Sequence, residues 1–255
     1  MNIPEPAPCR LLAWDTEFFH FRIARVEGDS LSHEQARRID EWSRSNHIRC
    51  LYLLARADDP GTVRAAETHG FHLVDIRATF ERKLDPSEPL EDSSQSAGCG
   101  IRPAQNGDLI ELQTLASEAH CGTRFFNDAQ FPRERARALY SLWIAQECQR
   151  GAQQVLVALS EEKRPVGYIS CHLDSVQREG KIGLLGVAEA LRGKGIGTHL
   201  LLAALRWFSQ QGASGASVVT QGRSFSAQRL YERCGFLIQN LQFWYHKWYP
   251  SEGTE

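Results

Sequence analysis

The chain has 255 residues, of which 42% are hydrophobic and 24% are charged, and its formal net charge at pH 7 is −2. These values are those of an ordinary globular protein, and so weak a net charge argues against a protein that binds nucleic acid through a basic surface. The seven cysteines are scattered and form no C-x-x-C pair, which fits a reducing compartment and argues against a disulfide framework or a zinc site.

The N-terminal residues show neither the basic segment nor the apolar segment of a signal peptide. No uninterrupted apolar run approaches the roughly 18 residues that a membrane span needs. We therefore expect a cytoplasmic protein that does not associate with membranes.

The first part of the chain is predicted to be a small α/β domain. Ser32 and Gln35 have the spacing of a capping box, which predicts a helix that continues through residue 42. The pattern predicts a strand over residues 50–55, a helix over 62–69 and one or two strands over 71–84.

Residues 85–98 differ in composition from what surrounds them, with two prolines, four serines and four acidic residues. Such a segment has too little apolar surface to order itself. We place the domain boundary there, which predicts an N-terminal domain over residues 1–84, a linker over 85–98, a second domain over 99–250 and a tail over 251–255.

The second domain is predicted to mix helices and strands. Asp108 and Glu111 suggest a capped helix through residue 119, and Pro132 begins a second, amphipathic helix. Strands are expected over 154–159, 165–173, 181–187, 216–220 and 237–248, with a helix after 196 that Gly212 ends and another around residue 231. Antiparallel strands followed by strand–loop–helix and βαβ segments give a mixed α/β domain.

A glycine-rich segment between the strand over 181–187 and the next helix is the most informative part of the sequence. Gly193, Gly195 and Gly197 remove side chains that would keep an anionic ligand from the backbone. The first N–H groups of a helix have no internal partners and attract phosphate. The spacing is not that of a P-loop or a Rossmann loop, and a glycine turn without a ligand is the alternative.

This segment resembles the pyrophosphate loop of the GNAT acyl-CoA transferases. Val187-x-x-x-x-Arg192-Gly-Lys-Gly-Ile-Gly197 matches the loop, with Glu189 where a proline is common. Ala227-x-x-Leu230-Tyr231-x-x-x-Gly235-Phe236 resembles the family's next helix and turn. The resemblance covers about residues 99–249. It implies the GNAT fold, a mostly antiparallel mixed sheet flanked by helices, with acetyl-CoA as cosubstrate and no metal.

The N-terminal domain carries a weak repeat of the same pattern. Arg64-x-x-Glu67-x-x-Gly70-Phe71 matches Arg229-x-x-Glu232-x-x-Gly235-Phe236, but the first copy has no glycine loop. The N-terminal domain is therefore interpreted as a partial, non-catalytic GNAT-like half, and chance similarity is the alternative.

The resemblance also implies roles for individual residues. Backbone N–H groups of Leu185, Gly186 and Val187 would bind the acetyl carbonyl and the pantetheine arm. Tyr231 would be the general acid for the CoA sulfur, and a core aromatic residue is the alternative. Ser224 replaces a common asparagine, which places its cofactor contact in question. The further cofactor-binding residues implied are Arg192, Gly193, Lys194, Gly195, Ile196, Gly197, Thr198 and Ser224.

Segments in both halves resemble the bacterial dTDP-fucosamine (dTDP-4-amino-4,6-dideoxygalactose) acetyltransferases. These segments are Leu12-Ala-Trp14-Asp-x-x-Phe-Phe19, Thr123-Arg124-Phe125, Leu139-Tyr140-x-x-Trp143-Ile144, Val219-Thr220-Gln221 and Phe243-Trp244-x-x-Lys247. The likeness implies direct N-acetylation of a nucleotide-linked amino sugar for surface polysaccharide.

Three residues are candidates for contact with this substrate. Arg124 suits a diphosphate, although a surface arginine on a loop fits equally well, and Phe125 and His172 are the other two. His172 and Asp174 are candidates for the general base, with a solvated strand end as the alternative. A ping-pong route through Cys171 or Cys234 would need an activating base, and no neighbouring motif suggests one.

Two alternative functions stay open at this stage. The enzyme could act on another amine, such as a protein N-terminus, an antibiotic or a polyamine, or the chain could be a CoA-binding module without catalysis. The aromatic C-terminal strand could pair across a homodimer.

Overall fold

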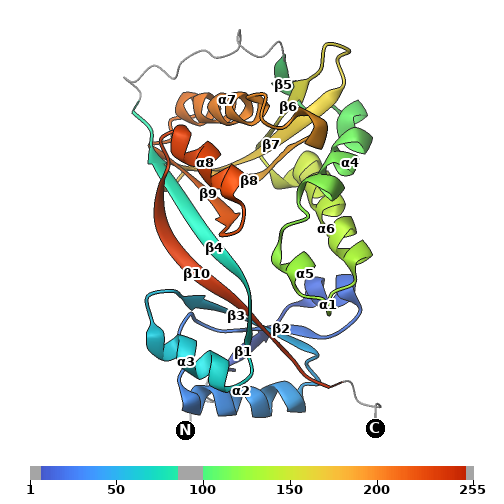
Figure 1. Cartoon of the computed structure of the whole chain (residues 1–255). Coiled ribbons are helices and arrows are strands. Elements are labelled where there is room, and N and C mark those ends of the chain that lie inside the picture. The colour runs from blue at the N-terminus through green and yellow to red at the C-terminus, as the bar shows by residue number, and fades with distance from the viewer. Residues whose placement is uncertain (1–6, 86–99, 251–255) are drawn as a thin grey trace. The chain divides into compact units, whose positions relative to one another are not determined.

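The computed structural model describes residues 7–85 and 100–250 (Figure 1). Most of the predicted linker, residues 86–98, and the tail over residues 251–255 lie outside these ranges. The chain divides into two compact units. Unit 1 comprises Met1–Arg77, Asn127–Phe131 and Leu241–Glu255, and unit 2 comprises Ala78–Phe126 and Pro132–Asn240. The strands β4 (His72–Lys83) and β10 (Leu237–Trp248) contribute residues to both units.

Unit 1 is a small sheet with helices. Strand β1 pairs antiparallel with β2, β2 parallel with β3, and β3 antiparallel with β10. Its core gathers alternate residues of β3, Leu51, Leu53 and Ala55, with Ile39 of α2 and Ala65 of α3. The other elements of unit 1 are β1 (Cys9–Leu11), α1 (Ala13–Phe19), β2 (Ile23–Val26), α2 (His33–Ser45), β3 (Cys50–Arg56) and α3 (Pro60–Thr68).

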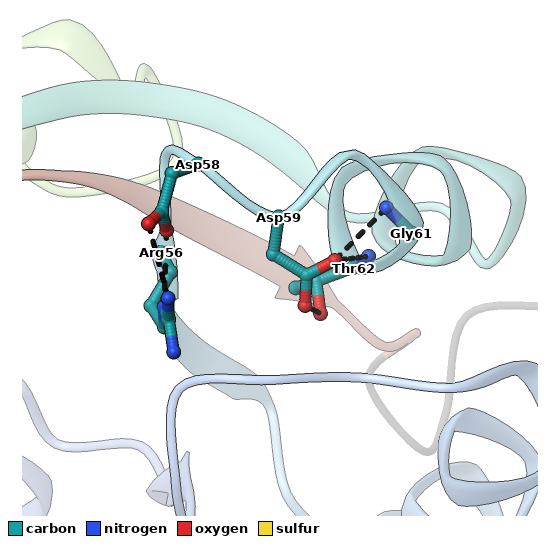
Figure 2. Close-up of polar contacts among 5 residues, drawn as sticks. All are labelled: Arg56, Asp58, Asp59, Gly61 and Thr62. Atoms are coloured by element: carbon teal, nitrogen blue, oxygen red, sulfur yellow. Dashed lines mark hydrogen bonds and ion pairs between the residues drawn. The ribbon is translucent and has the colours of Figure 1, made fainter.

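Local sequence signals set the helix starts of unit 1. The capping box predicted at α2 is confirmed: Gln35 N–H donates to Ser32 Oγ, and Ser32 N–H donates to Gln35 Oε1. Figure 2 shows the start of α3, where Asp59 Oδ1 accepts the N–H groups of Gly61 and Thr62 at 3.0 and 3.1 Å. A carboxylate at this position satisfies N–H groups that have no partner within the helix.

Unit 2 has a mixed, mostly antiparallel sheet with helices against it, which confirms the predicted fold class (Figure 1). From β4 onward its strand order is β4-β9-β8-β7-β6-β5, and among the pairs whose register is described for these strands only β8–β9 is parallel. The strands are β5 (Ile101–Pro103), β6 (Gln154–Leu159), β7 (Pro165–Asp174), β8 (Glu179–Val187) and β9 (Gly215–Gln221). The helices are α4 (Leu109–Ala119), α5 (Arg124–Asn127), α6 (Arg133–Gln146), α7 (Ile196–Gln210) and α8 (Phe225–Arg233), and a π-helical turn, Glu147–Gly151, extends α6.

The core of unit 2 lies between α7 and the sheet. Leu200, Ala204 and Phe208 of α7 are fully buried against Ile169 and Cys171 of β7. Gly212 ends the helix as predicted: its φ of +79° is in the left-handed region, and Ala213 N–H donates to Phe208 O at 3.0 Å.

The predicted capping box between Asp108 and Glu111 is wrong. Asp108 belongs to a 3₁₀ turn before α4, and its side chain does not cap that helix. Its carboxylate instead accepts two hydrogen bonds from Arg102, at 2.7 and 2.8 Å, and one from Gln105 N–H at 2.7 Å. A charged bidentate partner outcompetes the N–H groups of the helix for that carboxylate.

Candidate active site

The glycine loop joins β8 to α7 through a backbone that requires glycine at two positions. Gly193 has a φ of +77°, and Gly195, the residue that precedes α7, has a φ of +84°. Both values lie in the left-handed region, where a Cβ atom is unfavourable. No described side chain caps α7, so the first N–H groups of the helix remain available to an anion.

The third glycine has a different role. A Cβ atom on Gly197 would lie 3.2 Å from Leu230 Cδ2 of α8 and 3.9 Å from Val187 Cγ2. Gly197 therefore permits α7 and α8 to pack closely beside the end of β8, whereas a Cβ atom on Gly193 would meet nothing within 4 Å. The motif combines a turn for an anion with a close contact between helices.

The end of β8 is paired on one side only. The β8–β9 ladder runs from Glu179 and Gly215 to Ile182 and Val218, whereas β8 continues to Val187. On the other side, Leu185, Gly186 and Val187 pair with β7. Beyond Ile182, β8 has no β9 residue paired with it. Its backbone N–H and C=O groups on that side are therefore left for an extended ligand to bind. Arg192 Nε donates to Val187 O at 3.2 Å and ties the loop to this strand end.

A β-bulge lies in the middle of β8. Between the pairs Cys171–Ile182 and Ile169–Leu185, two residues of β8 face the single residue Ser170. Ser170 Oγ accepts the N–H of Leu184 at 2.8 Å, so the irregular backbone stays satisfied. Bulges of this kind redirect a strand and are frequent beside active sites.

Tyr231 projects from α8 into an aromatic environment. Its side chain is buried, with ring centroids 5.8 Å from that of Phe80 and 6.0 Å from that of Phe236. Burial raises the pKa of Tyr231 well above its ordinary value, so the phenol is protonated at neutral pH. Among residues 7–85 and 100–250, its hydroxyl group has no hydrogen-bond partner. A buried phenol of this kind can donate a proton to a ligand.

Ser224 precedes α8. Its carbonyl oxygen accepts the N–H of Gln228 at 3.0 Å, and its hydroxyl group does not cap the helix. The cofactor contacts expected of Ser224, Lys194, Ile196 and Thr198 stay predictions.

The three residues expected to contact the substrate have different surroundings. His172 Nε2 lies 2.7 Å from Glu147 Oε2 of the π-helical turn, and this contact raises the pKa of His172. The guanidinium of Arg124 lies 4.3 Å from the ring centroid of Phe125, and Phe125 is buried. His172 is thus held by a carboxylate, and Arg124 stacks on a core residue.

The family model described as the Acetyltransferase (GNAT) family matches residues 117–236, which span the β8 strand, the glycine loop and Tyr231. The chain contains a GNAT acetyltransferase domain. It is therefore an enzyme of the acyltransferase class.

Similar proteins support this assignment over different lengths. The dTDP-fucosamine acetyltransferase of Escherichia coli O6:H1 is 27% identical over 250 residues, which cover 96% of this chain and 100% of that protein. The N-alpha-acetyltransferase 30 of Xenopus laevis is 36% identical over 163 residues, 62% of this chain and 57% of that protein. The structure of a GCN5-related N-acetyltransferase from Sphaerobacter thermophilus matches with a TM-score of 0.69 and 19% sequence identity. The match covers 94% of this chain and 76% of that chain, and at this identity it supports the fold alone.

Cys171 and Cys234, the two cysteines considered for a ping-pong route, do not have the surroundings of nucleophiles. Burial raises the pKa of Cys171 to about 12, and burial also raises that of Cys234. The thiolate, which is the reactive form, is therefore disfavoured at both positions.

Tyr168 and His120 form a pair near β8 that the sequence did not single out as a site. Tyr168 of β7 packs on Gly186, and its hydroxyl oxygen is 2.9 Å from His120 Nε2. Gly186, inside a strand, could have indicated a close approach of this kind, but nothing in the sequence names the residue that approaches.

Two further features of the described residues concern metals and membranes. Within residues 7–85 and 100–250, no group of three or more His, Cys, Asp or Glu residues could hold a metal ion. None of the helices in these ranges has the length and apolar character that a membrane crossing needs.

Proposed function

We propose that this protein is an acetyl-CoA-dependent N-acetyltransferase that acts on the amino group of a nucleotide-linked amino sugar, similar to dTDP-4-amino-4,6-dideoxygalactose. The observation that carries the proposal is the likeness to the E. coli dTDP-fucosamine acetyltransferase, which spans 96% of this chain and all of that protein. The likeness includes the N-terminal half, which lies outside the family match over residues 117–236. A partial GNAT-like domain over residues 1–84, joined by the segment over 85–98, belongs to the same proposal.

The glycine loop fits the diphosphate of coenzyme A. The left-handed backbone at Gly193 and Gly195 and the uncapped first turn of α7 suit an anion. Arg192 and Lys194 add positive charge to the loop, and Ile196, Gly197 and Thr198 supply the first helical N–H groups. When bound, acetyl-CoA supplies the acetyl group as a thioester.

The end of β8 suits the acyl end of the cosubstrate. Backbone N–H groups of Leu185, Gly186 and Val187 that point away from β7 are donors of the type that stabilises a developing oxyanion. Such donors cost no reorganisation because the strand fixes them. Apolar side chains on these residues are therefore compatible with a role in transfer.

Tyr231 is the proposed general acid for the departing sulfur. Its raised pKa keeps the proton on the phenol at neutral pH, where the hydroxyl group can donate a hydrogen bond, and its proton, to the negative charge that develops on the sulfur as the C–S bond breaks. Direct transfer to the amine is favoured over a ping-pong route because burial suppresses ionisation of Cys171 and Cys234.

A protein N-terminus is the second candidate acceptor, because the GNAT domain also resembles the Xenopus N-alpha-acetyltransferase 30. The two are separated by measuring acetyl-CoA consumption with dTDP-amino sugars, N-terminal peptides and polyamines. We expect turnover with a dTDP-amino sugar and no rate above background with peptides or polyamines. Turnover with peptides alone would contradict the proposal, and acetyl-CoA binding without turnover of any amine would favour a non-catalytic module.

A further inference from the structure

His120 is held in place by two tyrosines of unit 2, Tyr168 of β7 and Tyr140 of α6. It follows the last residue of α4, and its Nε2 atom is 2.9 Å from the hydroxyl oxygen of Tyr168. Its ring stacks on that of Tyr140, with centroids 4.7 Å apart and an interplanar angle of 22°. The orientation of the imidazole is therefore fixed from two directions.

Both members of the His120–Tyr168 pair are neutral at physiological pH. Burial, with a smaller effect of the positive charge of Arg192, lowers the pKa of His120 to about 4. Burial raises the pKa of Tyr168 far above its ordinary value. A neutral imidazole therefore faces a protonated phenol, and their hydrogen bond has two possible directions.

The surroundings of Tyr168 decide between these directions. Tyr168 is fully buried, and within the described parts of the chain His120 is the sole partner of its hydroxyl group. A buried O–H group needs an acceptor, and the lone pair of Nε2 is the one available. Because the imidazole is neutral, its hydrogen must then be on Nδ1, and no described residue accepts it.

The pair lies on the face of the sheet opposite α7. A Cβ atom on Gly167 would meet Leu200 and Ile196 of α7, so Tyr168, the next residue of β7, points to the other face. Figure 1 shows α4 and α6 on the side of β7 and β8 away from α7. On that side the Tyr168 ring lies against Gly186, in the strand segment proposed to hold the acyl group.

We propose that Nδ1–H of His120 donates a hydrogen bond to an oxygen atom beside the acceptor amine, and so makes the enzyme select sugar amines over simple alkyl amines. This inference rests on the proposed function. Side chains of α7 fill the other face of the sheet, so an acceptor that reaches an acyl group held near Gly186 would come from the face that carries Tyr168 and His120. A neutral donor suits a sugar hydroxyl group, and it does not repel an ammonium group before deprotonation.

The tautomer of His120 can be measured without any substrate. Nitrogen-15 NMR of the wild-type protein, with His120→Asn used to assign the signal, should show hydrogen on Nδ1 and no titration above about pH 5, in keeping with the lowered pKa. In Tyr168→Phe the fraction of this tautomer should fall. A wild-type tautomer with hydrogen on Nε2 would overturn the inference and leave the proposed function intact.

The role in substrate choice is tested by kinetics. His120→Phe keeps an aromatic ring beside Tyr140 and removes both the Nδ1 donor and the acceptor of the Tyr168 hydroxyl group. Loss of the donor should raise the KM for the dTDP-amino sugar about tenfold. The KM for the analogue that lacks the hydroxyl group next to the amine should not change. His120→Asn, whose amide nitrogen can take the place of Nδ1, should restore part of the loss, and the Kd for acetyl-CoA should stay unchanged in both variants.

Three outcomes are distinguishable. Equal KM changes for the two acceptors would show that His120 supports the fold, and would overturn the inference alone. A KM unchanged in His120→Phe would also overturn it. If the wild-type protein acetylates no oxygen-bearing amine, the proposed function and this inference fail together.

Discussion

Tyr168 packs directly on Gly186: a Cβ atom on Gly186 would lie 2.8 Å from the hydroxyl oxygen of Tyr168 and 2.7 Å from its Cε1 atom. Both residues lie in the paired segment that follows the bulge in β8, with Gly186 opposite Tyr168 in the β7–β8 ladder. A backbone so close to a fixed ring has little room to shift. The strand segment that carries the proposed oxyanion donors is therefore positioned by an aromatic side chain on its neighbour.

Replacement of Gly186 by alanine should disrupt this contact. The added methyl group overlaps a fully buried ring, so we expect Gly186→Ala to reduce the free energy of unfolding by about 1–3 kcal/mol and to lower kcat. Denaturant unfolding and steady-state kinetics measure the two effects. Gly107→Ala is the control, since nothing lies within 4 Å of its Cβ position. Equal stability of the two variants would show that Tyr168 can move aside.

Gly195 in the glycine loop and Gly212 after the end of α7 both have a left-handed backbone, so the two positions can be compared. Gly195 has a φ of +84° and Gly212 a φ of +79°, so alanine at either position should cost about 1–2 kcal/mol of backbone strain. Gly195→Ala should also weaken acetyl-CoA binding, because it alters the turn before α7, whereas Gly212→Ala at the other end of the helix should not. Calorimetric titration of both variants tests this. Equal affinities would place the diphosphate elsewhere.

The Arg102–Asp108 pair predicts a dependence of stability on pH. The hydrogen bonds from Arg102 lower the pKa of Asp108 in the folded protein. Their stabilisation is therefore present above the unfolded-state pKa of about 3.9 and is lost as the pH falls through the folded value. Asp108→Asn should reduce the free energy of unfolding by about 1–2 kcal/mol at pH 7, and the difference should shrink in acid.

A solvent-exposed ion pair provides the control for Asp108. Arg56 and Asp58 also form two hydrogen bonds, both of 3.0 Å, but their side chains are 53% and 72% exposed (Figure 2). Exposed pairs contribute little because water screens them. Asp58→Asn should leave urea unfolding almost unchanged at pH 7, and a loss as large as that of Asp108→Asn would mean that burial does not set the strength of these pairs.

The His172–Glu147 contact predicts a stabilisation that is lost as the pH rises, the opposite of the pH dependence expected for Asp108. Because Glu147 raises the pKa of His172 in the folded protein, the stabilisation is complete below the unfolded value of about 6.5 and is lost as the pH rises through the folded value. Glu147→Gln should lower the pKa of His172 in an NMR titration and destabilise the protein near pH 6. The two proteins should converge in stability at alkaline pH, and a constant difference would point to packing instead.

Sequence reasoning succeeded where the signal is local. The turn at Gly193 and Gly195, the capping box at Ser32 and the end of α7 at Gly212 depend on residues a few positions apart, and the structure confirms each. It failed at Asp108, because the competing partner Arg102 comes from a different element, the strand β5.

Features that depend on strand register were not predictable. The bulge opposite Ser170 and the contact between Tyr168 and Gly186 exist only once β7 and β8 are aligned. His120 directly follows the helix that the sequence predicts through residue 119, but its partner Tyr168 is 48 positions away. No periodicity or spacing in the sequence brings such residues together.

Tyr231 carries the central chemical proposal, and a second buried tyrosine provides its control. Tyr249 donates a hydrogen bond to Asp40 at 2.7 Å, and both residues belong to unit 1. Tyr249→Phe should therefore reduce stability by about 1 kcal/mol and leave kcat unchanged. Tyr231→Phe should have nearly normal stability, because its hydroxyl group bonds to no described residue.

The most direct test is the kcat of Tyr231→Phe with a dTDP-amino sugar, measured together with the Kd for acetyl-CoA. Loss of a general acid should reduce kcat by about 10²–10⁴-fold, and the Kd should not change because the glycine loop is intact. A variant that turns over at the wild-type rate would contradict the assignment of Tyr231 as the proton donor and, with it, this account of the site.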